Sequence, residues 1–470
     1  MKEENYEIEF YGGRWISFLP FLIFIMIAIF LAIKQAPDLE GMWVAVLVGI
    51  IITFFFSKNK QNYSETIIDG LSDRVGMVPI ACWLFVGVFA TVLQESGLVE
   101  GIIWLIYSLG ATGTTFVVIS FLASGLFATS VGTAFGTIIA GMSVLYPAGV
   151  LLGGDPVLLA GAIASGGILG DNLAPISDTT ICSATSQETD IGGVVRSRVK
   201  YVIPATVLSI IVFIILGSGG DVESVPYEKV APYMNPVGLI MIIPALITII
   251  LALRGAHLIK ASIYGTVSAV FIGLIFRLLT FDALFQVKDG EVNGAIASGI
   301  SGMVEIIIFT LLLIISIKIM RKGKGSEALV ESAKKIVKTA RGAEMSTGFL
   351  VVAFSAIMGI NAPAILAIGL SYAKPIGDKF NIHPYRMANI LDGLGNTLAF
   401  TMPWTPTILL IHSQTVQANS EFGSSIPILS VSEIFPYLIY AWVLLVVMTI
   451  AVITGWGRKF SHNSIQNQNN

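Results

Sequence analysis

The chain has 470 residues, of which 55% are hydrophobic and only 12% are charged, and its mean hydropathy is +0.83. Soluble domains carry about 25% charged residues, so this composition excludes a soluble protein and predicts a polytopic membrane protein. The formal net charge of −3 gives no reason to expect nucleic-acid binding. Cys82 and Cys182 lie in or beside apolar segments, so neither a disulfide framework nor a redox role is indicated.

The first two apolar runs predict two spans and the position of the N-terminus. Trp15–Ile33 is long enough to cross a bilayer, and the polar segment before it contains no cleavage-like site, so we interpret it as a retained helix. The second run, Met42–Phe56, is followed by a loop that contains Lys58 and Lys60. Because cytoplasmic loops carry an excess of basic residues, this loop and the N-terminus are expected in the cytoplasm.

Four later apolar runs predict alternating spans, at Val202–Leu216, Val237–Leu253, Ala261–Leu279 and Met303–Met320. The basic group Arg196, Arg198 and Lys200 precedes the first of these runs. The loop after that run is mainly acidic, with Asp221, Glu223 and Glu228. The charges of the loops therefore predict the order in, out, in, out, in.

The segment Arg321–Arg341 is strongly basic, with seven lysine or arginine residues against two glutamates. Apolar residues recur in it at helical spacing, at Leu329, Ala333, Ile336 and Ala340. This pattern predicts an amphipathic helix on the cytoplasmic surface. A solvated linker helix without a mechanical role is the alternative interpretation.

An internal repeat is visible at an offset of 228 residues, where three prolines match three others without a gap. They are Pro147, Pro156 and Pro175 in the first copy and Pro375, Pro384 and Pro403 in the second. Chance identity in a sequence rich in alanine and glycine is the alternative. Proline is uncommon, at about 5% of residues, which favours a true repeat.

The charges that flank the two copies indicate that they are inverted. The basic segment Arg321–Arg341 corresponds to Leu93–Gly113, which contains two glutamates and no basic residue. The basic group before the third predicted span corresponds to a part of Gln414–Glu433, which also lacks basic residues. We therefore predict an all-α, inverted-repeat secondary transporter with roughly ten to twelve transmembrane segments. The expected division is scaffold helices at 1–78 and 202–306, repeats at 79–201 and 307–433, and a C-terminal helix and tail at 434–470.

Each repeat contains two polar interruptions. The first, Thr129–Thr133, corresponds to Gly359–Pro363, and both resemble the tips of re-entrant hairpins. The second runs from Gly170 to Thr180, reading G-D-N-L-A-P-I-S-D-T-T, and corresponds to a polar region that ends at Thr407. Proline lacks an amide donor and disfavours helix at the preceding residue, so a broken helix with free carbonyl groups is expected at each second interruption.

Three carboxylates are the main chemical candidates: Asp171, Asp178 and Asp392. A carboxylate inside the membrane costs about 2.5–3.5 kcal/mol on insertion scales, so it marks a functional site by default. Such a group can hold a proton until a cation displaces it, and one site then serves both ions by competition. The alternative is that each aspartate only caps a half-helix through backbone amides.

Other polar residues are weaker candidates. Glu305 could relay protons or reach the outer surface, Arg386 could face an organic anion or mark a helix end, and His412 is expected to be a satisfied polar residue. The chain has no phosphate-binding glycine-rich loop, no paired cysteine motif and no nucleophile constellation. An ATP-driven pump or an enzyme is therefore disfavoured.

The motif at Gly170–Thr180, together with G-A-I-A-S-G-G at Gly161–Gly167 and T-S-V-G-T-A-F-G-T at Thr129–Thr137, resembles the NhaC family of sodium/proton antiporters. The resemblance implies proton-coupled sodium exchange or, as in some relatives, movement of carboxylates or amino acids. It also implies a homodimer in the cell membrane of a bacterium, with both termini cytoplasmic, no cofactor, a fixed scaffold, a mobile transport domain and two arm helices. Leu93–Gly113 and Arg321–Arg341 occupy the arm positions.

Two function classes are therefore open. The first is sodium/proton exchange, with Asp171 and Asp178 as sodium ligands. The second is sodium- or proton-coupled transport of an amino acid or carboxylate, with Arg386 helping to bind the solute. The expected ion- or substrate-binding residues are Ser130, Thr133, Asp171, Asn172, Ser177, Asp178, Thr179, Thr180, Asn361, Asp392, Asn396 and Thr405. The expected partners are the lipid bilayer and a small ion or solute.

Overall fold

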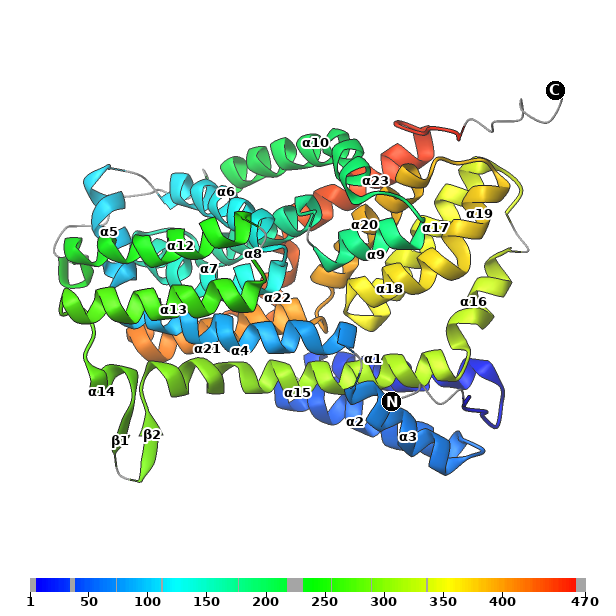
Figure 1. Ribbon diagram of the computed structural model, residues 1–470, viewed down its shortest axis with the longest axis horizontal. Coiled ribbons are helices and arrows are strands. Elements are labelled where there is room, and N and C mark those ends of the chain that lie inside the picture. Colours follow the sequence, from blue (N-terminus) through cyan, green and yellow to red (C-terminus); the bar gives the residue numbers. More distant parts are fainter. Residues whose placement is uncertain are drawn as a thin grey trace.

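The computed structural model describes residues 6–33, 39–72, 74–110, 113–175, 177–217, 231–254, 256–288, 290–334 and 337–461. Almost all of this described chain is helical (Figure 1). After a short 3-10 turn at Arg14–Phe18, the first half contains α1 (Leu19–Ile33), α2 (Leu39–Phe56), α3 (Lys60–Leu71), α4 (Arg74–Glu95), α5 (Leu98–Ser108), α6 (Gly113–Val131), α7 (Ala134–Leu151), α8 (Pro156–Leu173), α9 (Asp178–Ser186) and α10 (Ile191–Gly217).

The second half begins with 3-10 turns at Ala231–Tyr233 and Pro236–Met241, followed by α12 (Ile242–Leu253), α13 (Leu258–Ile275), α14 (Phe281–Leu284) and α15 (Ala295–Lys322). It continues with α16 (Gly325–Lys334), α17 (Ala340–Met358), α18 (Asn361–Ile368), a π-helical turn at Gly369–Ala373, α19 (Lys374–Lys379), α20 (Pro384–Thr401), α21 (Pro406–Phe422), α22 (Val431–Ile434) and α23 (Ile439–Thr454), with 3-10 turns at Gly423–Ser425 and Phe435–Tyr437.

Many of these helices suit a membrane. Within the described residues, five helices are long and apolar enough to cross one, and two bent helix pairs raise the number to seven. Four shorter apolar helices, at Arg14–Ala28, Glu40–Phe56, Gly113–Thr129 and Ile259–Ile275, would bring the total into the expected range of roughly ten to twelve if each also crosses. The outward face of α10 is apolar and exposed at Ile203, Val207, Ile211 and Ile215, as a lipid-facing surface requires.

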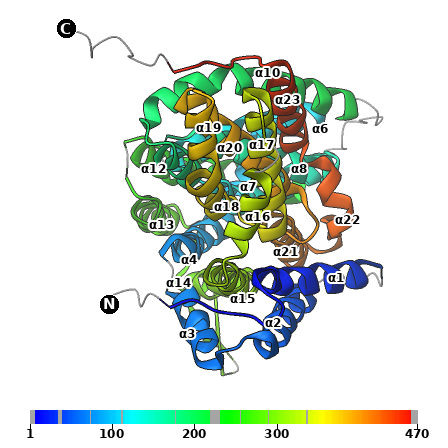
Figure 2. The ribbon, with the colours of Figure 1, turned by 90° about the vertical axis from the view of Figure 1, so that its right-hand side faces the viewer.

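The helices are arranged in layers when viewed along the long axis (Figure 2). In this view α2 and α3 lie on one side of α15, α1 lies beside α15, and α4 and α13 lie on its other side, next to the groups α6–α10 and α17–α23. The broken helices of both repeats therefore lie on the opposite side of α15 from α2 and α3.

Three boundaries differ from those expected from the sequence. Helix α10 begins at Ile191, so the basic group at 196–200 lies inside a helix and not in a loop before one. The amphipathic segment Arg321–Arg341 is divided among the end of α15, the helix α16 and the start of α17, because Lys324 adopts a positive φ of 55° after α15 ends. Of its apolar stripe, Ile336 lies outside the described residues, as does the acidic loop with Asp221. The chain also forms a small antiparallel hairpin of β1 (Gln286–Lys288) and β2 (Glu291–Asn293), which the all-α prediction did not include.

The ends of corresponding helices reproduce the offset of the predicted repeat. Pro384 and Thr401, which bound α20, each lie 228 residues after the corresponding ends of α8, Pro156 and Leu173. The matching arm helices, α5 and α16, lie at opposite ends of the molecule (Figure 1). This opposite placement is what two inverted copies produce.

Both predicted hairpins are present. Helices α6 and α7 meet at Gly132, which has a φ of +78°, and α17 and α18 meet at Gly359, with a φ of +66°. Glycine adopts such left-handed backbone conformations without the steric penalty that other residues pay. The two sharp turns therefore explain why glycine occurs at each tip.

The first hairpin packs very closely on α8. A Cβ atom added to Gly170 would lie 2.4 Å from the Gly125 carbonyl oxygen and 2.4 Å from the Ala128 Cβ atom. Only glycine leaves room for this approach of two backbones. The equivalent position in the second repeat is Leu398, which is half-buried, so this tight contact belongs to the first repeat alone.

The end of the described chain, residues 455–461, lies across the ends of α10, α17 and α20, and we call it the C-terminal strap. It is joined to the residues before α20 by backbone hydrogen bonds from His383 to Lys459 (2.9 Å) and from Ser461 to Asn381 (2.8 Å). Beneath it, Arg386 pairs with the fully buried Glu344 at 2.9 Å and donates to the Trp456 carbonyl at 3.0 Å. The strap thus covers a buried ion pair.

Candidate ion-binding site

The first broken helix is formed by α8 and α9. Helix α8 begins at Pro156, where the carboxylate of Asp155 accepts a hydrogen bond from the Leu158 amide at 2.7 Å. It ends at Leu173, and Ala174 is extended, as expected for a residue before a proline. Residues from Leu158 to Asn172 are all buried. The end of α8 is therefore buried, whereas Pro175 in the break is exposed.

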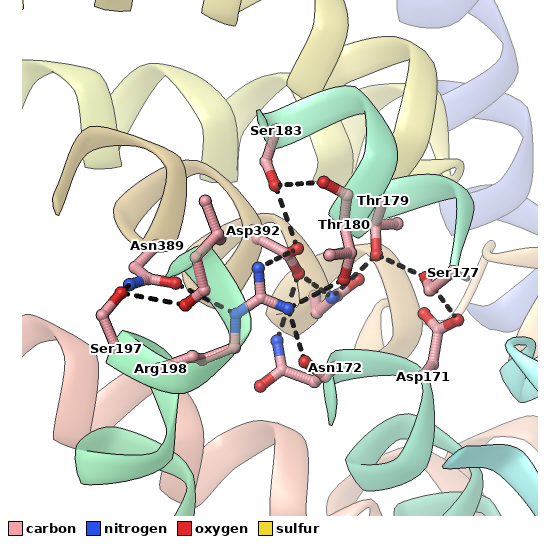
Figure 3. Close-up of polar contacts among 12 residues, drawn as sticks. Asp171, Asn172, Ser177, Thr179, Thr180, Ser183, Ser197, Arg198, Asn389 and Asp392 are labelled. Carbon is pink, nitrogen blue, oxygen red and sulfur yellow. Dashed lines mark hydrogen bonds and ion pairs between the residues drawn. The ribbon is translucent and has the colours of Figure 1, made fainter. Parts of the chain in front are cut away.

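Two aspartates flank this break. Ser177 donates a hydrogen bond to Asp171 Oδ1 at 2.9 Å, and its hydroxyl lies 2.9 Å from that of Thr179 (Figure 3). Asp178 begins α9, and its Oδ1 accepts a hydrogen bond from the Thr179 amide at 2.8 Å. Asp171 is buried, whereas Asp178 is exposed. The capping contact thus leaves the Asp178 carboxylate partly open.

The second broken helix is formed by α20 and α21. Asn396 departs from helical geometry within α20, with φ −85° and ψ 26°, and the chain is extended at Met402 before α21 begins. The side-chain Nδ2 atom of Asn396 donates to Asp392 Oδ1 at 2.7 Å and, more weakly, to the Thr179 hydroxyl at 3.4 Å. The side-chain amide of Asn361, from the tip of the second hairpin, donates to the side-chain Oδ1 atom of Asn396. These contacts join the two breaks into one polar network.

A buried arginine lies at the centre of this network. Arg198 of α10 is 1% exposed, and its Nη2 lies 2.5 Å from Asp392 Oδ2. Its Nη1 donates to the Asn172 carbonyl oxygen at 2.5 Å and to the Thr180 hydroxyl at 2.9 Å, and its Nε donates to Asn389 Oδ1 at 3.1 Å. The guanidinium group therefore binds both broken helices at once (Figure 3).

Asp392 is fully engaged by protein groups. Besides Arg198 and Asn396, its carboxylate accepts hydrogen bonds from the Asn172 amide at 3.2 Å and the Ser183 hydroxyl at 3.2 Å. A carboxylate that is 0% exposed needs such partners, since an unpaired buried charge is very costly. In this arrangement Asp392 is already neutralised, whereas no lysine or arginine of the described chain forms an ion pair with Asp171 or Asp178.

Asp178 lines a cavity of about 100 Å³. Its walls come from α4, α7, α15, α18 and α21, and most of the lining residues are apolar, including Phe135, Ile314 and Leu366. Arg321, in the last turn of α15, also lines it. The cavity therefore has Asp178 and Arg321 in the same lining.

Comparison with known proteins agrees with this arrangement. Residues 12–219, which contain α8, α9 and Arg198, match the model of the Na+/H+ antiporter family. This match covers the first part of the chain, which is similar to the family there. It is 25% identical over 94% of its length to the malate-2H(+)/Na(+)-lactate antiporter of Bacillus subtilis, covering 92% of that protein. It is 21% identical over 83% of its length to the Na(+)/H(+) antiporter NhaC of Alkalihalophilus pseudofirmus, covering 87% of that protein. The protein is therefore a membrane transporter and not an enzyme.

Solved structures also resemble the antiporter. The structure of Neisseria gonorrhoeae MtrF aligns with 93% of this chain and 97% of its own, with a TM-score of 0.46 and 12% identity.

The remaining predicted site residues of the antiporter fall into two groups. Asn172, Ser177, Thr179, Thr180, Asn361 and Asn396 all lie in the polar network. Thr405 instead donates to the Met402 carbonyl at 2.9 Å and closes the break before α21. Thr133 lies half-buried at the first hairpin tip, where its carbonyl accepts a hydrogen bond from Thr137 at 2.9 Å. The side chain of Ser130 lies outside the described residues.

Sequence reasoning missed Arg198, Asn389 and Ser183. Arg198 belongs to the sequence R-S-R-V-K, which the loop rule assigned to the cytoplasmic surface as a whole. Its neighbour Arg196 is exposed, as that rule expects. The signal that could have identified Arg198 was the excess of three membrane carboxylates over any buried cation, because buried charges are normally paired.

The structure also shows the surroundings of the three weaker candidates, Arg386, His412 and Glu305. Arg386 is bound by Glu344 and lies at the start of α20, which fits the helix-end interpretation and not the binding of an organic anion. The Nδ1 atom of His412 lies 2.7 Å from the Leu429 carbonyl oxygen, so this histidine is a satisfied polar residue. Glu305 is exposed and lines a cavity of about 430 Å³ together with Glu40.

The donor set suits a weakly held monovalent ion. Among the described residues, no group of three or more histidine, cysteine, aspartate or glutamate side chains could hold a metal ion. Carboxylate and hydroxyl oxygens, as at Asp171, Ser177 and Thr179, are hard ligands that favour small hard cations.

Proposed function

We propose that this antiporter exchanges sodium for protons at Asp171 and Asp178. The observation that supports this most strongly is the contrast in charge pairing at the two breaks. Asp171 and Asp178 flank one break without a basic partner in the described chain, whereas Asp392 at the other break is held by Arg198. Unpaired carboxylates inside a membrane protein require a mobile positive charge.

The mechanism follows from competition for that charge. Asp178 opens to the cavity and can receive an ion from it. Asp171 lies behind Ser177, whose hydroxyl can act as a donor to the carboxylate or as an acceptor toward a cation. When sodium binds, the carboxylates release their protons to water, and when sodium leaves, protons from water bind to them again. The same carboxylates therefore bind either sodium or protons, but not both at the same time.

The experiment is sodium-dependent proton flux in proteoliposomes, measured against pH and normalised to folded protein. We expect Asp178→Asn to abolish exchange and Asp171→Asn to reduce it severely, because the amide keeps the shape but removes the titrating group and its charge. Glu305→Gln is the matched control, since Glu305 is exposed and lies outside the network. It should retain nearly normal flux.

The capping alternative predicts a different result. Loss of a cap would cost about 0.5–2 kcal/mol of stability, while the surviving protein would exchange ions with ordinary pH dependence. Wild-type flux from both Asp171→Asn and Asp178→Asn would reject the proposed site.

One observation favours a second candidate, exchange of a small organic acid. The cavity at Asp178 is lined mainly by apolar side chains, which suits a solute with an apolar part better than a bare ion. The Bacillus subtilis relative is a malate/lactate antiporter by name. The same proteoliposomes, loaded with malate or lactate, distinguish the two candidates, because only the second predicts proton flux that depends on the organic acid.

The proposal also includes an arrangement in the membrane. Residues 79–201 and 307–433 form the moving repeats, and 1–78 and 202–306 form the scaffold of a homodimer in a bacterial cell membrane, with both termini cytoplasmic. The family resemblance supports this division. Cross-linking in native membranes tests the dimer, and insertion of glycine into α16 tests the arm, which should lower turnover while leaving ion affinity nearly unchanged.

A further inference from the structure

We propose that Arg198 is a permanent internal cation that occupies Asp392 and so limits exchange to the charges of Asp171 and Asp178. The inference rests on the proposed function, and it assigns a specificity-determining role to a residue outside the sodium ligands.

The contacts of Arg198 show that it is fixed in place. All three of its nitrogen atoms contact protein groups, which come from α8, α9 and α20. The carbonyl oxygen of Asn172 is one that the break in α8 leaves without a helical donor. A free carbonyl beside a break could serve as a cation ligand, but here it is occupied by the guanidinium group.

The chemistry of arginine makes this cation permanent. A guanidinium group keeps its charge at any physiological pH and cannot leave with the substrate, unlike sodium or a proton. Its planar fork binds a carboxylate and neighbouring acceptors together. Arg198 therefore neutralises Asp392 in every state of the cycle, as a transported ion neutralises an unpaired carboxylate while it is bound.

The charge balance of the network gives the consequence. The network contains three carboxylates and one guanidinium group, so two negative charges are left for mobile ions. Without Arg198, the same network would hold three uncompensated carboxylates. It would then need one more sodium ion or proton in each cycle, because an unpaired buried charge is strongly unfavourable.

The test counts the sodium ions bound per purified protein at saturating sodium by equilibrium dialysis, and records sodium-driven proton flux in proteoliposomes. Wild type, Arg198→Gln, Arg198→Gln/Asp392→Asn and Arg198→Lys are compared. We expect Arg198→Gln to bind one more sodium ion than wild type. That ion is exchanged for one more proton, so the net charge moved per cycle stays the same. The double variant should return to the wild-type number of bound sodium ions, because it removes a positive and a negative group together.

The variant Arg198→Lys separates the effect of charge from the effect of shape. Lysine keeps the positive charge but cannot form the forked contacts with Asn389, Asn172 and Thr180, so turnover should fall while the number of bound sodium ions stays at the wild-type value. Arg196→Gln is the matched control, because Arg196 lies two residues away on the same helix and is exposed. Both the flux and the number of bound sodium ions should be unchanged in that variant.

The outcomes separate this inference from the proposed function. A wild type without sodium-driven proton flux would contradict the proposed function itself. Normal flux in the wild type with an unchanged number of bound sodium ions in Arg198→Gln, or with a changed number in Arg198→Lys, would contradict the role of Arg198 alone. If Arg198→Gln does not fold, the double variant decides: an unchanged number of bound ions supports the role of Arg198, and a number lower by one would show that Asp392 holds a mobile ion in the wild type.

Discussion

The two broken helices of this antiporter have the same backbone plan and different chemistry. Helices α8 and α20 are matched in length and both end in an extended residue, at Ala174 and Met402. Around the first break lie two carboxylates and two hydroxyls, and around the second lie amides and a carboxylate bound to arginine. The two copies therefore keep one architecture, while only the second has a carboxylate paired with an arginine among the described residues.

An all-or-none labelling experiment tests whether the two repeats are inverted. With Cys82 and Cys182 replaced by alanine, cysteines are introduced at Ser108 of α5 and Ser332 of α16, which are both exposed. A membrane-impermeant maleimide added outside intact cells should label the first position only. Labelling of both from the same side would mean that the copies are parallel.

The difference in charge pairing predicts a difference in stability. Asp392→Asn strands the Arg198 guanidinium, and breaking a buried ion pair in this way costs about 3–5 kcal/mol. Asp171→Asn removes only a carboxylate that accepts one hydrogen bond from Ser177, so it should cost about 1 kcal/mol. Thermal unfolding of the purified variants in detergent measures both effects. Equal melting temperatures would contradict the view that only one break contains a structural ion pair.

The hairpin contact should also be specific to the first repeat. Gly170→Ala places a methyl group against Gly125 and Ala128, and such overpacking costs about 1–3 kcal/mol. Leu398→Ala, at the equivalent position of the second repeat, only shortens a half-buried side chain and should cost less. The melting temperatures of the two variants provide the comparison, and the reverse order would show that the second hairpin packs more tightly.

The smallest expected effect concerns the residues that cap the two helices. The amide of Leu158 binds Asp155 at the start of α8, whereas the amide of Tyr385 binds the Nδ1 of His383 before α20 at 3.2 Å. Burial, together with the nearby Lys459 ammonium group, lowers the pKa of His383 below its ordinary value of 6.5. The folded protein therefore binds this proton less readily than the unfolded chain does.

The sign of the pH effect follows from that lowered pKa. The contribution of the cap is present above about pH 6.5 and is lost as pH falls through the lower value in the folded state. Its size is about 0.5–2 kcal/mol. His383→Asn keeps a cap acceptor that does not titrate, so the fall in melting temperature between pH 7.5 and 5 should be smaller than in the wild type. Asp155→Asn should not reduce that fall, and an identical fall in wild type and His383→Asn would exclude the histidine cap as a source.

Much of the fold could be predicted because proline and glycine mark backbone geometry locally. Pro156 and Pro384 marked equivalent positions of the repeat, which are the starts of α8 and α20, and Gly359 lay in a predicted hairpin tip. The end of α15 was harder to place, since the basic segment continues through the break at Lys324 with no change in composition.

The candidate site was predictable where its residues lie next to a break. Asp171, Ser177 and Thr179 are close in sequence, so their proximity followed from the motif. Arg198 and Asp392 are 194 positions apart, and no local pattern links them. The inward direction of Arg198 depends on the rotation of α10, which began earlier than the apolar run indicated.

The C-terminal strap has a consequence for biosynthesis. Glu344 receives its second arginine, Arg458, at 2.8 Å only from the strap, and Arg386 there binds the Trp456 carbonyl oxygen. While the ribosome is still making the chain, α17 and α20 have emerged, but these final partners have not. Their shared cluster can therefore close only after residues 455–461 have been synthesised. A chain truncated before Trp456 would leave the buried pair of Arg386 and Glu344 without this cover.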